Sequence, residues 1–179
     1  EITWKRKGCM VIHLFDHIPS KPSTFKEELI LEAIAQFSNI KMLQVIREKY
    51  GLVYSTGTTG FVKKDPYELL TLSIRYMIDP VNIEKSSKLL EEEALTPMSQ
   101  GQISDREVEQ LKAILKTTYI TSFYDEKQIE EEWLNRNVKY GTILSPELIN
   151  ETINSITAEE IKKMMKEVVD MNNYHYTIR

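Results

Sequence analysis

A long helical pattern that stops at a glycine and passes at once into strand sequence most limits how this chain can fold. Thr24 and Glu27 form a capping box, in which each side chain satisfies an exposed amide of the other residue. The helix is predicted to run to about Lys49, with Gly51 as its left-handed terminator, and a strand begins at Leu52. The apolar residues at helical spacing are Phe25, Leu29, Ile30, Ala33, Ile34, Phe37 and Ile40.

Two strands are predicted to follow this helix, over residues 52–62 and 67–78. The second alternates, with Leu70, Leu72, Ile74, Tyr76 and Ile78 on one face and Thr71, Ser73 and Arg75 on the other. Because the connection between the two strands is short, they must pair antiparallel. The glycines of Thr56–Gly60 mark a place where another backbone, such as a substrate, can approach.

The remaining segments complete a two-layer pattern. A buried strand is predicted over 8–15 and a last strand over 173–179. Helices are predicted from Pro80 to about Leu95 with Pro97 as the stop, over 104–122, over 125–139, from Ser145, and over 157–171. The order β-α-β-β-α-α-α-α-α-β predicts an α+β fold with a mostly antiparallel sheet and helices packed on one face.

Composition sets the broad class. The chain has 179 residues, which fits a single domain over 1–179, and 41% hydrophobic residues, which is enough for a core. A net charge of −4 lacks the basic footprint of a nucleic-acid binder, so no nucleic-acid partner is expected. No apolar run approaches the ~18 residues of a membrane-spanning helix, so no membrane span is expected either.

The single cysteine and the first residue bear on the origin of the chain. Cys9 alone excludes an internal disulfide framework and a multi-cysteine metal site, and it leaves cytoplasmic and periplasmic locations both open. Because the chain opens on Glu1 directly into strand-like sequence, we expect a fragment or a processed chain of a larger protein.

The segment from His13 to His17 reads H-x-x-D-H and invites a metal-site interpretation with Asp16 as the carboxylate. Two histidines four apart share a zinc ion when they lie on one face of a helix. Here the segment is β-branched and Pro19 follows closely, so a strand is predicted. On a strand, residues four apart are separated by roughly 13 Å, which is too far for two ligands of one zinc. We therefore assign no metal ligand in this chain, and an independent metalloenzyme remains the least favoured hypothesis.

Arg47 and Tyr54 are the candidate binding residues. Arg47 falls in the last turn of its helix, where a cation suits the negative end of the helix dipole, and Tyr54 lies early in the next strand. A guanidinium at this junction can donate to a peptide carbonyl, and a phenol can donate to a carbonyl that becomes an oxyanion. The simpler alternative is an arginine paired with a nearby glutamate and a half-buried strand tyrosine.

Several segments, in the same order, resemble the pitrilysin/insulinase family of zinc metallopeptidases, which includes the mitochondrial processing peptidase. They are residues 47–55 (REKYGLVYS), the alternating strand ending at 79–80 (DP), residues 101–112 (GQISDREVEQLK) and residues 156–161 (ITAEEI). The resemblance covers most of the chain from about residue 25 to 179. It implies a metallopeptidase-lobe fold, and it is similar to the second, C-terminal lobe, which lacks the zinc motif.

The resemblance implies roles for both candidate residues. Arg47 and Tyr54 match an arginine and a tyrosine that contact the substrate backbone in this family, and the tyrosine also helps to stabilise the transition state. Zinc would then sit in a partner lobe, in the same chain or in a separate subunit, and this chain would be inactive alone. The function implied is a substrate-gripping, non-catalytic domain of a zinc-dependent endopeptidase acting on peptides. The alternative is a structural or assembly module of a peptidase-like complex without proteolysis.

Two other features have plainer interpretations. The acidic runs 91–93 and 130–132 are predicted to be solvated helix faces. Met164 and Met165 are predicted to lie in the core or on a helix face.

Overall fold

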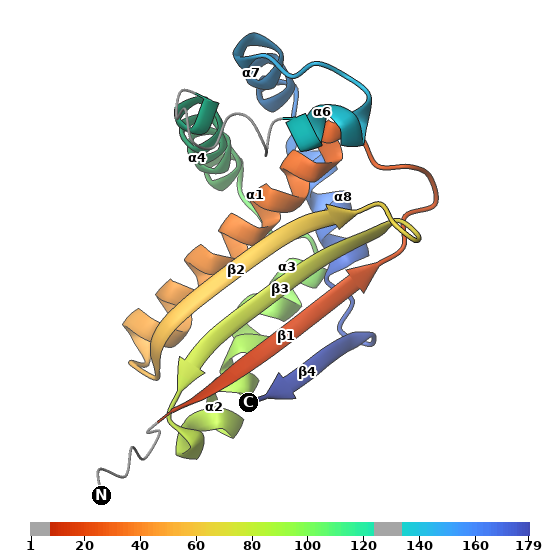
Figure 1. Cartoon of the computed structure of the whole chain (residues 1–179). Helices are drawn as coiled ribbons and strands as arrows, with labels where there is room; N and C mark the ends of the chain where they lie inside the picture. Colours follow the sequence, from red (N-terminus) through yellow and green to blue (C-terminus); the bar gives the residue numbers. More distant parts are fainter. Residues whose placement is uncertain (1–7, 124–133) are drawn as a thin grey trace, which may run out of the picture.

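The computed structural model describes residues 8–123 and 134–179, and within these residues an antiparallel sheet forms one layer of the molecule (Figure 1). Its strands are β1 (Cys9–His17), β2 (Val53–Lys63), β3 (Leu69–Ile78) and β4 (Tyr174–Ile178). They are arranged in the order β2-β3-β1-β4, so β2 and β4 form the two edges of the described sheet. All pairings are antiparallel, as the sequence predicts.

The second layer is helical and lies behind the sheet in Figure 1. The first helix is α1 (Phe25–Met42), which continues as a π-helical segment, η1 (Leu43–Lys49). After the sheet hairpin come η2 (Pro80–Asn82), α2 (Ile83–Leu90), η3 (Glu91–Leu95), α3 (Thr96–Ser99), α4 (Asp105–Phe123), α6 (Leu134–Tyr140), α7 (Pro146–Asn154) and α8 (Ala158–Val168). The predicted α+β fold, with helices on one face of an antiparallel sheet, is confirmed.

The helix starts are also where the sequence predicts them. Thr24 and Thr157 each form a complete capping box, with hydrogen bonds in both directions to a glutamate three residues later. Ser104 makes the same reciprocal bonds with Glu107, and Ser145 caps α7. Both partners of such a cap lie within one turn, so local sequence alone specifies them.

The core lies between α1 and the sheet. The residues of β3 predicted to face it are all buried, and so are Met164 and Met165 of α8. Thr71 and Ser73, on the opposite face of β3, are buried as well, although they were predicted to lie on a partly polar face. Thr71 is satisfied there because its hydroxyl donates to Asp16 Oδ1 at 2.6 Å.

One predicted segment differs from the structure, and another is only partly described. The helix predicted to stop at Pro97 instead continues to Ser99, and Gly101 adopts the left-handed conformation with φ of 71°. The π-helical segment before it shifts the bonding pattern, since Thr96 N–H bonds to Glu91 O, five residues back, and the helix then passes through the proline. Of the helix predicted over 125–139, residues 125–133, including the acidic run 130–132, lie outside the described residues, and α6 covers the rest.

The helix over Phe25–Lys49 is long and apolar enough to cross a membrane by length and composition. Most of its apolar stretch is buried inside the molecule, and core helices of water-soluble proteins can have the same length and composition. It contacts the sheet as the central core helix, which accounts for its apolar composition without a lipid environment (Figure 1).

A buried charge cluster attaches α6 to α1. The Glu28 carboxylate, whose side chain is almost fully buried, accepts from Lys139 Nζ at 2.6 Å and from the hydroxyl of Tyr140. Arg136 lies 3.8 Å from the same carboxylate and 3.3 Å from Glu32. Because Glu28 is removed from water, these contacts replace the solvation that the carboxylate loses on folding.

Candidate functional site

The junction between η1 and β2 holds both residues predicted to bind substrate. The chain leaves the helix through Gly51, whose φ of 62° confirms the predicted left-handed terminator. Gly51 N–H bonds to Arg47 O at 2.9 Å, and Leu52 N–H bonds to Ile46 O at 3.0 Å. These bonds satisfy carbonyls that a helix end otherwise leaves unpaired, and they fix the backbone of Arg47.

A second set of contacts holds the same helix end against η3. Glu93 accepts from Lys49 Nζ and from the Tyr50 hydroxyl, each at 2.6 Å, through its two carboxylate oxygens. The Lys49 ammonium also lies 5.0 Å from the centre of the Tyr50 ring. These hydrogen bonds raise the pKa of Lys49 and lower the pKa of Glu93, so both groups stay charged. We call this trio the Glu93 clasp.

The side chain of Arg47 is exposed and makes no hydrogen bond or ion pair with any described residue, unlike the side chains of Lys49 and Tyr50 in the Glu93 clasp. The plain alternative of an arginine paired with a nearby glutamate does not occur among the described residues. A free guanidinium on a fixed backbone can donate to a ligand without first breaking an internal contact.

Tyr54 lies in β2 at an irregularity in the pairing with β3. Val53 pairs with Ile78 and Ser55 pairs with Met77, so Tyr54 is the extra residue of a β-bulge. Such bulges redirect a side chain and are frequent beside functional sites. The side chain of Tyr54 lies outside what the structure describes, so the predicted contact of its phenol stays a prediction.

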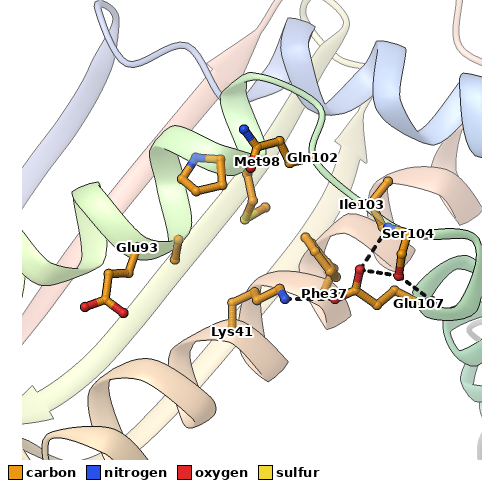
Figure 2. Close-up of a pocket in the computed structure, with 10 residues that line it drawn as sticks. Phe37, Lys41, Glu93, Met98, Gln102, Ile103, Ser104 and Glu107 are labelled. Carbon is orange, nitrogen blue, oxygen red and sulfur yellow. Dashed lines mark hydrogen bonds and ion pairs between the residues drawn. The ribbon is translucent and has the colours of Figure 1, made fainter.

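A separate pocket of about 560 Å³ lies between α1 and the segment that joins α3 to α4 (Figure 2). Its apolar lining residues are Phe37, Ala94, Pro97, Met98 and Ile103. Polar groups surround them, and Lys41 points toward Glu107 across the opening in Figure 2. Arg47 does not line this pocket, which meets the Glu93 clasp only through Glu93.

The polar side of this pocket is an ion pair already satisfied within the protein. Glu107 accepts from Lys41 Nζ at 2.8 Å and from Ser104 N and Oγ at 2.9 and 2.7 Å. Burial acts to raise the pKa of Glu107, but the hydrogen bonds from Lys41 and Ser104 outweigh it and lower the pKa to about 2. Because the two charges are paired with each other, the pocket offers a ligand its apolar residues together with polar groups such as Gln102.

The segment from His13 to His17 is a strand, β1, as predicted, and this strand extends past the predicted end at residue 15 to His17. His13 is fully buried on the helix side of the sheet, whereas Asp16 is on the opposite face and bonds to Thr71. Within 8–123 and 134–179, no three or more His, Cys, Asp or Glu residues are grouped to hold a metal ion. The described residues therefore do not fit a zinc site.

His13 instead joins an aromatic cluster. Its ring lies 5.9 and 5.7 Å from the rings of Tyr76 and Tyr174, both stacked, and 5.0 Å from Tyr176. Its Nε2 is 3.4 Å from the Tyr76 hydroxyl, and its Nδ1 has no hydrogen-bond partner among the described residues. Burial lowers the pKa of His13 to about 4, so the ring is neutral near pH 7.

Sequence reasoning missed the Glu93 clasp and the anchoring role of Glu91. The run 91–93 was predicted to be a solvated face, and its residues are partly or fully exposed, but two of the three also hold other segments in place. Glu93 holds Lys49 and Tyr50, and Glu91 accepts from the Tyr174 hydroxyl at 2.6 Å. These partners are far apart in the sequence, so no local pattern identifies them.

Comparison of the sequence with known protein families found no match, and comparison with curated proteins found none. Comparison of the fold with solved structures did find similar chains. The periplasmic protease PqqL from Escherichia coli superposes with a TM-score of 0.73 at 15% identity, over 97% of this chain and 19% of that chain. The peptidase M16 inactive domain from Pseudomonas fluorescens gives 0.72 at 16% identity, over 96% of this chain and 40% of that chain.

A chain of Complex III2 from Candida albicans has a TM-score of 0.67 at 15% identity, over 90% of this chain and 40% of that chain. This chain thus spans about a fifth of the length of the Escherichia coli protease and two fifths of the other two. At these identities the likeness is one of fold. The chain has the fold of a peptidase M16 lobe, and the inactive M16 domain is among the structures that share it.

Proposed function

We propose that this chain is the substrate-contacting, non-catalytic lobe of a zinc-dependent endopeptidase of the pitrilysin/insulinase kind, with residues 1–179 forming one domain of a larger assembly. The observation that carries the proposal is Arg47, whose exposed guanidinium is unpaired among the described residues, on a backbone fixed by Gly51 and flanked by the Glu93 clasp. The likeness to an inactive M16 domain over 96% of the chain supports the same assignment.

In this proposal Arg47 and Tyr54 act on an extended peptide held against the start of β2. The Arg47 guanidinium donates to a substrate carbonyl and fixes the peptide in place. The Tyr54 phenol donates to the carbonyl oxygen that gains negative charge during hydrolysis. In this proposal zinc sits in the partner lobe, where it would supply the activated water; the described residues of this chain hold no group of three or more His, Cys, Asp or Glu that could bind a metal ion.

Steady-state kinetics of the assembled enzyme test these roles. Tyr54→Phe should lower kcat by ~10²-fold, the effect of losing one oxyanion donor, with little change in KM. Arg47→Ala should mainly raise KM, because it removes binding shared by the ground and transition states. Arg106→Ala is the matched control, since Arg106 is an exposed arginine on α4 in the helical layer. If kcat and KM were unchanged in both Tyr54→Phe and Arg47→Ala, the proposed roles of these two residues would be wrong.

The chain by itself should neither bind zinc stoichiometrically nor cleave peptides. Isothermal titration with zinc and a fluorogenic peptide assay on the purified chain measure both properties. Cleavage that persists after every zinc-bearing partner has been removed would contradict the assignment to a non-catalytic lobe.

A structural or assembly module is the second candidate function. The observation in its favour is that a chain of Complex III2 from Candida albicans shares this fold. The two candidates differ in the partner lobe, which carries an intact zinc motif only in the first. Sequencing the partner lobe and assaying the assembly for peptide cleavage therefore distinguishes them.

A further inference from the structure

The outer edge of β4 presents unpaired backbone groups. Met10 and Arg179 exchange both of their backbone hydrogen bonds, at 2.8 and 2.9 Å. In antiparallel pairing, bonded and non-bonded positions alternate along the strand. The backbone N–H and C=O groups of Tyr174, Tyr176 and Ile178 therefore point away from β1, and no described residue bonds to them. Figure 1 shows β4 at the side of the sheet opposite β2.

This edge is held in place from the helical side. The Tyr174 hydroxyl donates to Glu91 at 2.6 Å, and the Tyr176 hydroxyl lies 3.0 Å from Ser87 Oγ. The Tyr174 ring also stacks on Phe15, with the ring centres 5.0 Å apart. Because the strand is already ordered, a partner that pairs with it does not have to bear the entropic cost of ordering it.

Although β4 is short, it lacks several features that protect edge strands from pairing. It contains no lysine, proline or glycine, and its register with β1 has no shift. The opposite edge strand, β2, has the bulge at Tyr54 and ends in Lys63. On β4 two apolar side chains stay exposed beside the free backbone groups, Tyr176 at 41% and Ile178 at 47%.

We propose that the outer edge of β4 is a docking site for an extended segment of another polypeptide, which adds to the sheet as a further strand. A row of alternating N–H and C=O groups is complementary to an extended backbone. On the helical side, Tyr176 and Ile178 favour apolar residues at alternate positions of the added strand. On the face of the sheet away from the helices lie His175, Thr177 and the cationic Arg179. The intervening positions of the added strand are therefore expected to be polar or acidic.

The size of the edge separates this partner from a second copy of the chain. β4 has five residues, whereas a standard protein interface uses ~20–30 residues on each side. Pairing of two β4 strands alone is too small to hold two whole molecules together. A peptide strand takes its affinity from main-chain hydrogen bonds and a few side-chain contacts, which this edge provides.

This docking site is on the edge opposite Tyr54 and does not depend on the proposed function. The test uses the full chain and a capped, fluorescent peptide that alternates valine with threonine or glutamate. Fluorescence anisotropy should show saturable binding with a Kd below about 1 mM. In NMR spectra, the amides of Tyr174, Tyr176 and Ile178 should shift most and exchange more slowly. Arg106→Ala, at an exposed arginine on α4 with no assigned binding role, should bind the peptide as well as the parent chain does.

Backbone methylation of the peptide provides the sharpest control. Peptide residues opposite the outward-facing positions of β4 place their valine side chains on the helical side and their N–H groups toward β4. N-methylation of the valines should therefore weaken binding at least tenfold, whereas N-methylation of the intervening residues should change it less than twofold. Equal effects of the two modifications, or no saturable binding, would overturn the proposal.

Ile178→Pro tests the same hydrogen bonds from the protein side. Its N–H points outward, so proline removes one donor to the partner without removing a bond between β4 and β1. Peptide affinity should fall at least tenfold, and Ile178→Val, which keeps the N–H, should bind as before. Peptide contacts at the β2 amides in place of β4 would place the docking edge elsewhere and contradict the inference.

Discussion

Gly60 of β2 lies directly against Leu31 of α1, and a Cβ on Gly60 would come within 2.7 Å of the Leu31 carbonyl oxygen. The sequence predicts that another backbone approaches the glycines of Thr56–Gly60. At Gly60 that backbone is the protein's own core helix and not a substrate. Gly57, on the opposite face of the strand, would place a Cβ in open space.

Gly60→Ala should therefore destabilise the protein by about 1–3 kcal/mol, the usual cost of overpacking a core contact. The strain is not easily relieved, because the atom met by the new methyl group is backbone. Gly57→Ala should leave the free energy of unfolding within about 0.5 kcal/mol, since its methyl group meets nothing within 4 Å. Urea denaturation of both variants measures the difference, and equal stabilities would show that α1 moves aside without cost.

Glu28→Gln should cost about 3 kcal/mol of stability, the scale for breaking a buried ion pair and leaving its cations uncompensated. The amide keeps the shape of the side chain but removes the charge that Lys139 contacts at 2.6 Å. Glu84→Gln, at an exposed glutamate of α2, is the control and should change stability by less than about 0.5 kcal/mol. A loss in Glu28→Gln no larger than in this control would mean that α6 is attached to α1 mainly by apolar contacts.

Because of His13, the free energy of unfolding should decrease as the pH falls from about 6.5 to about 4. Burial lowers its pKa from 6.5 to about 4, so across this range the unfolded chain binds a proton that the folded chain does not. Protonation therefore favours unfolding, and the loss between pH 7 and pH 4 amounts to about 3 kcal/mol. Glu107 has a pKa of about 2, so the stability that it contributes is lost between pH 4.5 and pH 2. Most of that loss lies below the pH range in which His13 acts.

His13→Phe removes the titrating group while keeping a ring among the tyrosines, so the slope of stability between pH 4 and 6.5 should largely disappear. Thermal denaturation followed by circular dichroism over this range measures the slope. His175→Phe, at an exposed histidine of β4, should retain the contribution of His13. An unchanged slope in His13→Phe would assign the pH dependence to other groups.

Tyr50→Phe should loosen the end of η1 without unfolding the domain. It deletes the hydroxyl that donates to Glu93 at 2.6 Å. The amides of Gly51 and Leu52, which bond to Arg47 O and Ile46 O, should exchange roughly fivefold faster with deuterium, because one of the bonds holding this turn is lost. Tyr67→Phe, at an exposed tyrosine, is the matched control and should leave these amides unchanged. Equal exchange in the two variants would show that the Glu93 clasp does not order this turn.

The fold followed closely from local patterns. Helix starts at Thr24 and Thr157 were predictable because a capping box needs only two residues three positions apart. The alternation in β3 and the turn at Gly51 were also predictable, because each depends on residues that are close together in the sequence. The stop at Pro97 was not, because a π-helical segment upstream, whose bonds span five residues, changed the pattern that the proline interrupts.

The candidate site was only half accessible to sequence reasoning. The positions of Arg47 at a helix end and Tyr54 at a strand start follow from chain order, and the structure agrees with both. That the Arg47 side chain has no partner among the described residues, while Lys49 and Tyr50 bind Glu93, could not be foreseen, because Glu93 is 44 residues from Lys49. The substrate roles of Arg47 and Tyr54 remain predictions.

The sequence by itself determined which segments are helices and strands, where they are capped, and that the sheet is antiparallel, because those features depend on bonds and periodicities within a few residues. Only the tertiary structure decided that His13 is buried among tyrosines, that Glu28 meets Lys139 from 111 residues away, and that β4 lies at an edge of the described sheet. Burial and long-range pairing depend on how the layers pack, and packing joins residues that no local pattern connects.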